Sequence, residues 1–388
     1  LGSADLLRRA MGKKDKEEMD DQREDFVSGA IKNNLNRSQA NELFDLLEKF
    51  AGYGFNKSHA AAYAKIAYQT AYLKAHHASS FLAASMSADM NNTDNIHLLF
   101  DDCKINSVEL LPPDVNESSY KFIPLTNKKI LYGLGAIKGT GDSSIDLILE
   151  ERKNNGPYTS LFDFTLRLDL TKVNRRVVES LVRSGAFDKI EPNRSSLLAS
   201  VNLAIKMAEQ RKNEAGQEGL FGTSDIEAIK LVDMNPWEEK MQLLEEKAAL
   251  GFYFSGHLFS YYKKIIKSFI STKLIDLKPR QDSYLIAGIV SSVRYRPSSR
   301  GKIAIVTIDD GEASIDALLG NKLLTQSYNL IKDDELIIIE GRVSVDDYSG
   351  GNRLSAIKVY DLMMFQSLNA NLLKISLNGQ ADAFKLKE

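Results

Sequence analysis

A lysine and a histidine stand at the start of an alanine-rich stretch with helical periodicity, GYGFNKSHAAAYAKIAYQTAYLKAHH. Ser58 is a residue type suited to the N-cap of a helix that runs to His77. Lys57 and His59 would then lie at a helix N-terminus, where free N–H groups and the helix dipole favour an anion. His59 and Tyr63 are four residues apart and would share a helix face. This group suits a triphosphate with its sugar and base; the alternative is an incidental cap with tyrosines packed in a core.

Two further segments carry groups that suit phosphate. Near the beginning, LGSADLLRRAMGKK places Arg8 and Arg9 after a short amphipathic turn. A guanidinium fork fits phosphate, but a run of charge is also typical of a solvated face. Residues 137–141 (IKGTG) precede a predicted helix, as in helix-hairpin-helix units, whose glycines let backbone N–H groups approach a DNA phosphate. Ile145, where alanine is usual, departs from that pattern, and a plain tight turn is the alternative.

Cations later in the chain could follow a DNA backbone. The stretch KVNRRVVESLVRSGAFD carries Arg175, Arg176 and Arg183 near a second helix, which suits duplex DNA. Residues 294–302 (RYRPSSRGK) interleave cations with an aromatic residue, an arrangement typical of single-strand binding by OB folds. The cations there are Arg294, Arg296, Arg300 and Lys302. A solvated charged hairpin is the alternative.

A short apolar motif lies in a glycine-rich, acidic segment. Gln217 is followed by Leu220 and Phe221, and no local helix face could bury the last two. Exposed apolar residues of this kind often fill a pocket of a partner protein. The alternative is a loop that tucks both side chains onto its own domain.

Composition excludes several classes of protein. The 50 Lys and Arg balance 52 Asp and Glu, so a uniformly basic coat is excluded but local basic patches are not. A single cysteine, Cys103, excludes a disulfide framework, and the five histidines are too scattered for a zinc cage. No apolar run reaches the roughly 20 residues of a membrane span. The aspartates that occur in pairs are adjacent in sequence, so their side chains would point in different directions on a strand or a helix. They would not converge on a metal ion, and no catalytic centre is predicted. A first residue of leucine suggests a piece of a longer chain.

The elements that must position these groups change in type along the chain. At about 100–200 residues per domain, 388 residues predict roughly two to four domains. Helical periodicity fills the first part, at 25–35, 40–55 and 60–77. Short strands at 120–125 and 128–134 precede helices near 142–154, 160–167, 172–184 and 194–214. From 284 to 362 the period falls to two, with five strands and a helix between the third and fourth. The predicted fold is multidomain, mainly α-helical and then an all-β OB barrel.

These motifs together resemble the bacterial C-family replicative polymerases, the alpha subunits of DNA polymerase III. ADLLRRAMGKK, GYGFNKSHAAAYAKIAYQTAYLKAH, YGLGAIKGTG, NRRVVESLVRSGAFD and GIVSSVRYRPSSRGKIAIVTIDD carry the resemblance, which covers roughly residues 1–362. It implies fingers at 1–117, a helix-hairpin-helix duplex-binding region at 118–215 and an exposed linker with a clamp-binding peptide at 216–234. A helical connector at 235–280, an OB fold at 281–365 and a tail at 366–388 follow.

The resemblance also implies roles for particular residues. The positions that face the incoming nucleotide correspond to Arg8, Arg9, Lys57 and His59, with Tyr53 and Tyr63 nearby. Gly139 and Gly141 match the hairpin that grips the duplex backbone, and Lys138, Arg175 and Arg176 are predicted beside it from the residues themselves. The sliding-clamp peptide corresponds to Gln217, Leu220 and Phe221, with Gly219 as a departure from the polar or acidic residue common there.

A resemblance of this extent implies template-directed DNA synthesis by a longer subunit, with Mg²⁺ held by palm aspartates upstream of this segment. The implied partners are primer–template DNA, single-stranded template, dNTP and the beta sliding clamp, with the clamp-loader tau subunit and other replisome subunits, in the bacterial cytoplasm and without a membrane. The competing hypothesis is a non-enzymatic scaffold that joins a helix-hairpin-helix unit to an OB fold. An upstream carboxylate pair would separate the two.

Overall fold

The computed structural model describes residue 10 and residues 16–53, 57–215, 230–298, 301–345 and 350–369. Contacts divide the chain into two compact units, Leu1–His77 and Ala78–Glu388. This boundary lies inside the range 1–117 that the sequence groups as one helical domain. The helices after His77 contribute Leu82 and Ile96 to the core of the second unit, and for that reason they belong to it.

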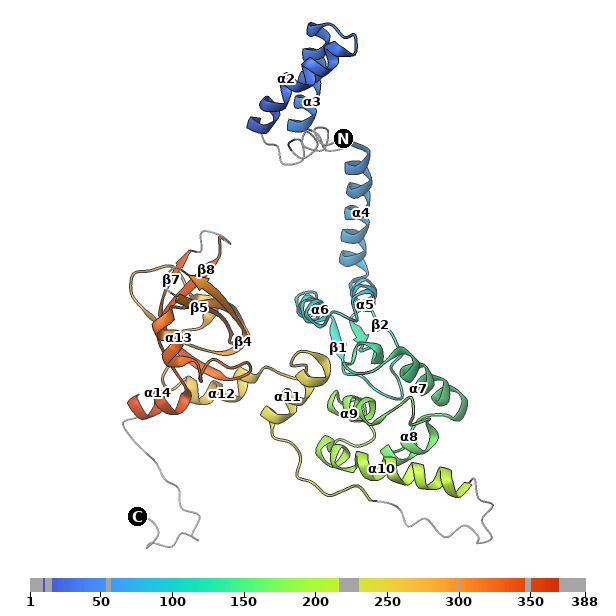
Figure 1. The fold of residues 1–388 in the computed structure, drawn as a ribbon. Coiled ribbons are helices and arrows are strands. Elements are labelled where there is room, and N and C mark those ends of the chain that lie inside the picture. The colour runs from blue at the N-terminus through green and yellow to red at the C-terminus, as the bar shows by residue number, and fades with distance from the viewer. Residues whose placement is uncertain are drawn as a thin grey trace. The chain divides into compact units, whose positions relative to one another are not determined.

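The described helices of the first unit are α2 (Lys16–Lys32), α3 (Arg37–Tyr53) and α4 (Lys57–His76) (Figure 1). An asparagine-rich turn joins α2 to α3, and the Asn36 side chain accepts a hydrogen bond from the Gln39 N–H at 2.8 Å. Arg23 of α2 reaches two carboxylates of α3, Asp45 and Glu48, at 2.6 Å each. These contacts hold α2 and α3 together as a helical hairpin.

The second unit begins with helices and a small sheet around one apolar core (Figure 1). Its first helices are α5 (Ala78–Ala88), α6 (Thr93–Ile105), η1 (Leu134–Ala136), α7 (Asp142–Asn155), α8 (Leu161–Arg167), α9 (Arg175–Arg183) and α10 (Arg194–Ala215). The sheet has the order β1 (Glu109–Leu111), β3 (Lys129–Leu131), β2 (Ile123–Thr126), with β1 parallel and β2 antiparallel to β3. The side chains of Asn92, Ser160 and Asn174 accept backbone N–H groups and so begin α6, α8 and α9.

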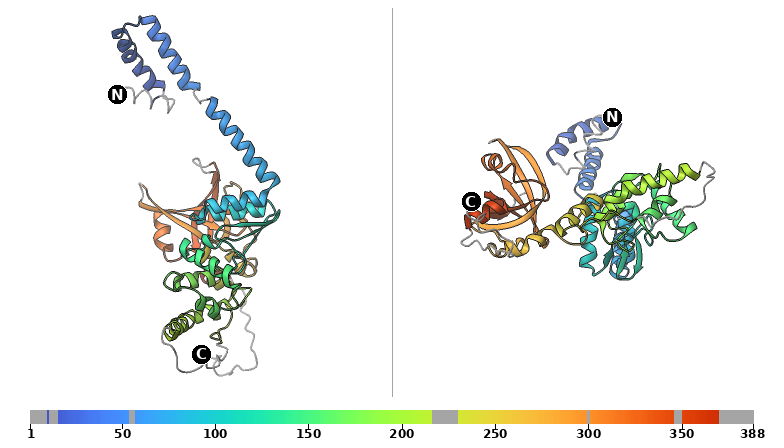
Figure 2. Two further views of the ribbon diagram at one scale, coloured as in Figure 1. Left: turned by 90° about the vertical axis from the view of Figure 1, so that its right-hand side faces the viewer. Right: turned by 90° about the horizontal axis from the view of Figure 1, so that it is seen from below.

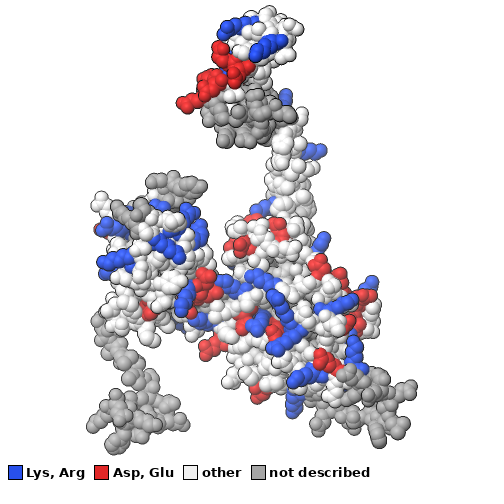
Figure 3. Space-filling view, viewed as in Figure 1, with Lys and Arg blue, Asp and Glu red and all other residues white. Residues whose placement is uncertain are grey.

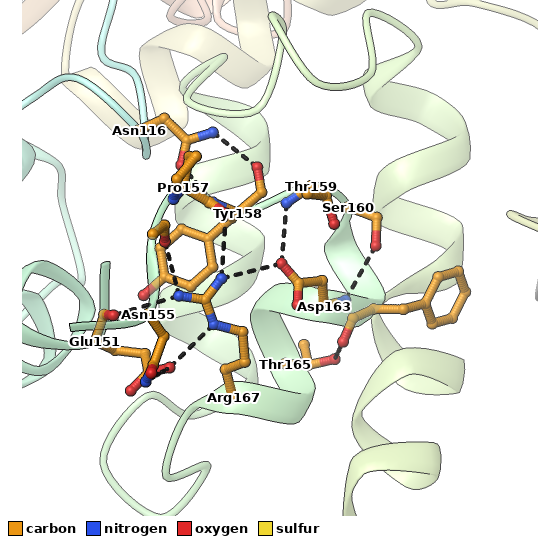
Figure 4. A network of polar contacts seen from close by, with 12 residues as sticks. Asn116, Glu151, Asn155, Pro157, Tyr158, Thr159, Ser160, Asp163, Thr165 and Arg167 are labelled. Atoms are coloured by element: carbon orange, nitrogen blue, oxygen red, sulfur yellow. Dashed lines mark hydrogen bonds and ion pairs between the residues drawn. The ribbon is translucent and has the colours of Figure 1, made fainter. Parts of the chain in front are cut away.

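One arginine joins α7 to α8 (Figure 4). The Arg167 guanidinium donates to the Glu151 carboxylate at 3.0 Å and to the Gly156 carbonyl at 2.8 Å. It also lies 4.5 Å from the centroid of the Tyr158 ring. Because a guanidinium has five N–H donors in a fixed plane, one side chain can satisfy carbonyls that the end of α7 leaves unpaired. This contact holds the helices that follow the glycine-rich turn in one arrangement.

A helical connector links this part to the barrel. It comprises α11 (Glu239–Leu250), α12 (Leu258–Ile266) and η2 (Leu274–Asp276). Lys247 of α11 and Tyr253 after it both donate to the carboxylate of Asp334, in the turn before the fourth barrel strand. The connector therefore contacts the barrel through a shared carboxylate, as well as through apolar side chains.

The last part of the chain forms a barrel of strands (Figures 1 and 2). The barrel is closed and has the strand order β4–β5–β6–β8–β7. Its strands are β4 (Tyr284–Ser298), β5 (Gly301–Asp309), β6 (Ser314–Leu319), β7 (Leu336–Val345) and β8 (Asn352–Tyr360). The helix α13 (Asn321–Ser327) lies between β6 and β7 in sequence, and α14 (Leu362–Asn369) follows β8. The unbroken apolar run of β7 is explained by burial on both faces. Ile337 and Ile339 fill the barrel, while Leu336 and Ile338 pack outside it with Phe365 of α14.

The predicted fold class is confirmed by this architecture. All five predicted barrel strands and the helix between the third and fourth are present, and the predicted helices after residue 140 correspond to α7 to α10. The predicted strands at 120–125 and 128–134 correspond to β2 and β3. β1 is not among the predicted strands, because a three-residue strand is too short for alternation to be visible in the sequence.

Candidate nucleic-acid interface

The glycine-rich turn between η1 and α7 presents backbone to solvent. Lys138, Gly139 and Gly141 are exposed, and Gly139 has φ +84°, a conformation that favours glycine. The Thr140 hydroxyl donates to the Ile137 carbonyl at 2.7 Å, which holds the turn from within. Gly141 occupies the N-cap position of α7, so the free N–H groups of the first helical turn lie beside it.

One segment distant in sequence, residues 172–180, lies beside this turn. A Cβ placed on Gly139 would lie 3.3 Å from Nε of Arg176 and 3.2 Å from Oγ of Ser180, both on α9. The Ser144 hydroxyl of α7 donates to the Lys172 carbonyl at 2.8 Å, in the loop before α9. The start of α7 and the start of α9 are therefore neighbours, and their exposed cations surround one surface.

We call this surface the hairpin patch; its residues are Lys138, Gly139, Gly141, Lys172, Arg175 and Arg176. All six are exposed. The structure thus brings together the five residues that the sequence predicts for duplex DNA and adds Lys172, which sequence patterns do not distinguish from other surface lysines. Figure 3 shows Lys and Arg side chains gathered over this part of the second unit and over the barrel, with acidic residues between them.

Two carboxylates temper the positive charge of the hairpin patch. Glu179 accepts from Arg175 at 2.6 Å, one helical turn away on α9. Asp142, the first residue of α7, accepts a hydrogen bond from the Tyr120 hydroxyl, and that bond is the largest cause that raises the pKa of Tyr120 to about 12. In the described contacts, neither carboxylate pairs with the other three cations of the patch, which are Lys138, Lys172 and Arg176.

A second glycine turn follows α9, and a side chain covers its backbone instead of leaving it exposed to solvent. Gly185 has φ +85°, and a Cβ placed on it would lie 2.8 Å from Cζ of Arg194. Arg194 pairs with Asp188 at 2.6 Å and is itself buried. Arg183, which the sequence groups with the DNA-facing arginines, instead pairs with Glu245 of α11. The prediction for Arg183 is therefore corrected: its charge faces the connector, because the fold docks α11 at the end of α9.

The residues predicted to face a nucleotide lie in the first unit. Lys57 is the first residue of α4, so Ser58 lies inside the first turn rather than before it. The rings of His59 and Tyr63 are neighbours, with centroids 4.4 Å apart, as the four-residue spacing predicts. No residue of α4 is buried in the described part of the structure. Its tyrosines therefore do not pack in a core there, and that alternative is wrong for the described residues. Tyr53 ends α3, and nothing is described of its side chain; Arg8 and Arg9 lie outside the described residues.

The barrel separates the cations and aromatic residue that the sequence interleaves. In the register of β4 with β5, Arg294 and Arg296 pair with Ile305 and Ile303, whose side chains lie on the outer face. Tyr295 pairs with Ala304, which belongs to the barrel interior, so its side chain has the opposite orientation. The prediction of one interleaved face is therefore corrected, since strand residues alternate between faces.

The same register divides the charges of the barrel into two groups. On the outer face, Arg294 pairs with Asp316 at 2.7 Å and Arg296 is exposed. On the other side, the Lys302 ammonium lies 4.2 Å from the centroid of the Tyr295 ring. Arg300 lies outside the described residues, as do the predicted clamp-binding residues Gln217, Leu220 and Phe221.

Two further properties of the described residues bear on other functions. Across the described ranges, no three His, Cys, Asp or Glu side chains lie close enough together to hold a metal ion. No helix in the described part of the chain is long and apolar enough to span a membrane.

Three family profiles match successive parts of the chain. Residues 1–34 match the bacterial DNA polymerase III alpha subunit finger domain, residues 107–197 the helix-hairpin-helix motif and residues 284–362 the OB-fold nucleic acid binding domain. The DNA polymerase III subunit alpha of Neisseria meningitidis serogroup B is 47% identical over 386 residues, which are 98% of this chain and 34% of that protein. Those of Vibrio cholerae serotype O1 and Escherichia coli strain K12 are each 43% identical, again over 98% of this chain and 34% of theirs. The chain spans about a third of the length of these relatives.

Proposed function

We propose that this chain, which belongs to the family of the DNA polymerase III alpha subunits and spans about a third of their length, holds primer–template DNA and the incoming nucleotide during DNA synthesis by a complete subunit. The hairpin patch is the observation that carries the duplex part of this proposal. It combines exposed glycine backbone at a helix start with cations from two distant segments. Backbone N–H groups and cationic side chains are among the groups that proteins use most often to bind DNA phosphates.

Duplex binding by the hairpin patch has a direct test. The 388-residue chain should bind a blunt DNA duplex in fluorescence anisotropy, with affinity falling as salt rises. Lys172→Ala and Arg176→Ala should each weaken binding to all sequences alike and reduce the salt slope by about one. Lys128→Ala, an exposed lysine in the turn between β2 and β3, is the control and should leave the slope unchanged. Unchanged slopes for both test variants would refute the assignment.

Nucleotide binding is proposed for the start of α4. The exposed side chains of Lys57, His59 and Tyr63 support it, because they lie within the first two turns of a helix whose N–H groups favour phosphate. Arg8, Arg9 and Tyr53 are proposed from the sequence resemblance alone. In the complete subunit, Lys57→Ala should raise KM for dNTP or lower kcat and leave duplex affinity nearly unchanged. Lys65→Ala, two turns further along α4, serves as the control; a large loss of duplex affinity with normal nucleotide kinetics would contradict the proposal.

On the sequence resemblance, the metal ions of the reaction are proposed to be held by palm aspartates of the complete subunit and not by residues of this chain. Mg²⁺ would supply charge stabilisation to phosphoryl transfer in the complete subunit. No proton or metal step is assigned to residues of this chain. We therefore expect the purified 388-residue chain to bind DNA without extending a primer. Incorporation of nucleotides by this chain alone would overturn that view of its role.

Docking on the sliding clamp is proposed from the sequence of residues 216–234. Gln217, Leu220 and Phe221 have the types and spacing of a clamp-binding peptide. Leu220→Ala with Phe221→Ala should abolish retention of the chain on immobilised beta clamp, and unchanged retention would refute the docking site. Contacts with the clamp-loader tau subunit and a cytoplasmic location are proposed with it, on the same resemblance.

Single-stranded template is the proposed ligand of the barrel. The matching OB-fold profile and the outward cations Arg294 and Arg296 support it. The alternative is a non-enzymatic scaffold that uses the same two DNA-binding regions. The complete protein separates the two, since a scaffold would bind primer–template DNA and extend no primer.

A further inference from the structure

We propose that Tyr295 and Tyr328 form a stacking platform for a base of single-stranded nucleic acid at the rim of the barrel. This inference rests on the proposed binding of single-stranded template by the barrel and names a subsite within it. Neither the sequence motifs nor the family profiles assign a role to Tyr328.

The two rings come from separate elements. Tyr295 lies near the end of β4, and Tyr328 is the C-cap residue of α13. Their ring centroids are 6.5 Å apart, with an angle of 32° between the planes. Tyr295 is 40% exposed and Tyr328 58% exposed, so the pair presents aromatic surface to solvent. Neighbouring side chains cover only part of each ring, which leaves aromatic surface on which a planar ligand can stack.

The register of the barrel explains why Tyr295 reaches this position. Tyr295 has the inward orientation of Val293, which is partly buried against the barrel core. Its partner across the strand pair, Ala304, is fully buried and small. β4 pairs with β7 only as far as Ile289, whereas its pairing with β5 continues to Ser298, so Tyr295 lies beyond the part of β4 that closes the barrel against β7. The side chain is therefore directed to the end of α13.

Local contacts hold the platform in place before any ligand binds. The Asn321 side chain, at the start of α13, donates to the Lys302 carbonyl at 3.2 Å. Leu324 and Ser327 of α13 are buried, which fixes the helix that ends at Tyr328. A rigid aromatic surface loses little conformational entropy when a flat ring stacks on it. The site is thus organised in advance for a planar ligand.

Charge favours a nucleic acid over a neutral aromatic ligand. The Lys302 ammonium lies 4.2 Å from the centroid of the Tyr295 ring and is exposed. It could therefore neutralise a phosphate next to a base that stacks on the neighbouring ring. Aromatic rings beside a cation form the usual arrangement for binding single strands without sequence preference. Arg294 and Arg296, on the outer face of the same strand, would contact the backbone of the nucleic acid as it leaves the platform.

The experiment compares a strand that has bases with one that lacks them. The 388-residue chain is titrated into labelled oligo(dT) and into an abasic deoxyribose-phosphate oligomer of equal length. Tyr328→Ala and Tyr295→Ala should each weaken binding to oligo(dT) about tenfold, the effect of losing one stacked base, and leave binding to the abasic oligomer unchanged. Tyr328→Phe should bind as the parent chain does, because the ring is kept. Tyr261→Ala, a 42% exposed tyrosine on α12, is the matched control and should have no effect.

The outcomes distinguish this platform from the function it rests on. If Arg294→Ala with Arg296→Ala lowers affinity for oligo(dT) and the tyrosine variants do not, the barrel binds single strands and the platform is refuted. If none of these variants changes affinity, single-strand binding by the barrel is refuted as well. An equal loss for oligo(dT) and the abasic oligomer would also refute stacking, since it would show that the rings act on the backbone or on the fold.

Discussion

Arg194 and Glu246 form an ion pair of 3.1 Å between α10 and α11, although their side chains are only 8% and 1% exposed. Glu246 also accepts the N–H groups of Phe254 at 3.2 Å and Ser255 at 2.9 Å. The connector therefore docks on the helix-hairpin-helix part through a carboxylate whose hydrogen bonds are satisfied. Buried charges of this kind are tolerated only when they are paired.

Loss of this carboxylate should destabilise the protein strongly. Glu246→Ala leaves the Arg194 guanidinium with one acceptor fewer and two backbone N–H groups without one. We expect the free energy of unfolding in guanidinium chloride to fall by about 3–5 kcal/mol. Arg175→Ala breaks the exposed ion pair with Glu179 and should change the free energy of unfolding by less than about 1 kcal/mol. Similar losses in both variants would show that burial does not set the strength of the Arg194–Glu246 contact.

The two glycines of the hairpin patch should respond differently to alanine. Gly139 has φ +84° and close neighbours on α9, so Gly139→Ala should lower the free energy of unfolding by about 1–2 kcal/mol. Gly141 has ordinary backbone angles, and a methyl group added there would meet no atom within 4 Å, so Gly141→Ala should leave stability nearly unchanged. If a DNA phosphate approaches this backbone closely, the added methyl group should hinder that approach, so Gly141→Ala should weaken duplex binding about tenfold, as expected when one hydrogen bond from a backbone N–H to the phosphate is blocked. Unchanged affinity would place the phosphate elsewhere.

Two buried tyrosines form a matched pair for the effect of a hydroxyl. The Tyr132 hydroxyl has no hydrogen-bond partner within the described part of the chain, whereas the Tyr158 hydroxyl donates to the Ile148 carbonyl at 2.8 Å. Tyr132→Phe removes an unpaired polar group and should leave the free energy of unfolding unchanged or raise it by about 1 kcal/mol. Tyr158→Phe should lower stability by about 1 kcal/mol. A clear loss on Tyr132→Phe would reveal a partner for that hydroxyl.

Acid should weaken the contact between α7 and α8. The hydrogen bond from Arg167, and then that from Asn155, lower the pKa of Glu151 below its ordinary value of 4.5. A carboxylate with a lowered pKa stabilises the fold above the ordinary value, and this contribution is lost as pH falls through the lowered value. Glu151→Gln should therefore reduce stability by about 1 kcal/mol at pH 7, and the difference from the parent chain should shrink below pH 4.5. A difference that is constant from about pH 7 to about pH 3 would contradict this role.

Much of the fold could be predicted because its signals are local. The short runs of apolar and β-branched residues in β4 to β8 and the glycines of residues 137–141 are properties of short segments, and the structure confirms the elements they predict. The same holds for the ring contact of His59 with Tyr63, which depends only on helical spacing. These features required no knowledge of distant residues.

Predictions that depended on which face a residue occupies were less successful. Arg183 has the type and spacing of a DNA-facing residue, but the docking of α11 gives it Glu245 as a partner. Tyr295 is adjacent to two arginines in sequence and points away from both, because the register of β4 against β5 sets its orientation. A single sequence contains neither the register nor the docking.

Residue types and short spacings were enough to establish the order of elements, the open glycine turn and the family resemblance. The folded chain was needed to show that Lys172 joins the hairpin patch, that Arg194 closes the second glycine turn and that Tyr328 meets Tyr295. Each of those contacts joins segments that are separated in the sequence. Their geometry depends on how helices and strands pack into one core, which no local pattern encodes.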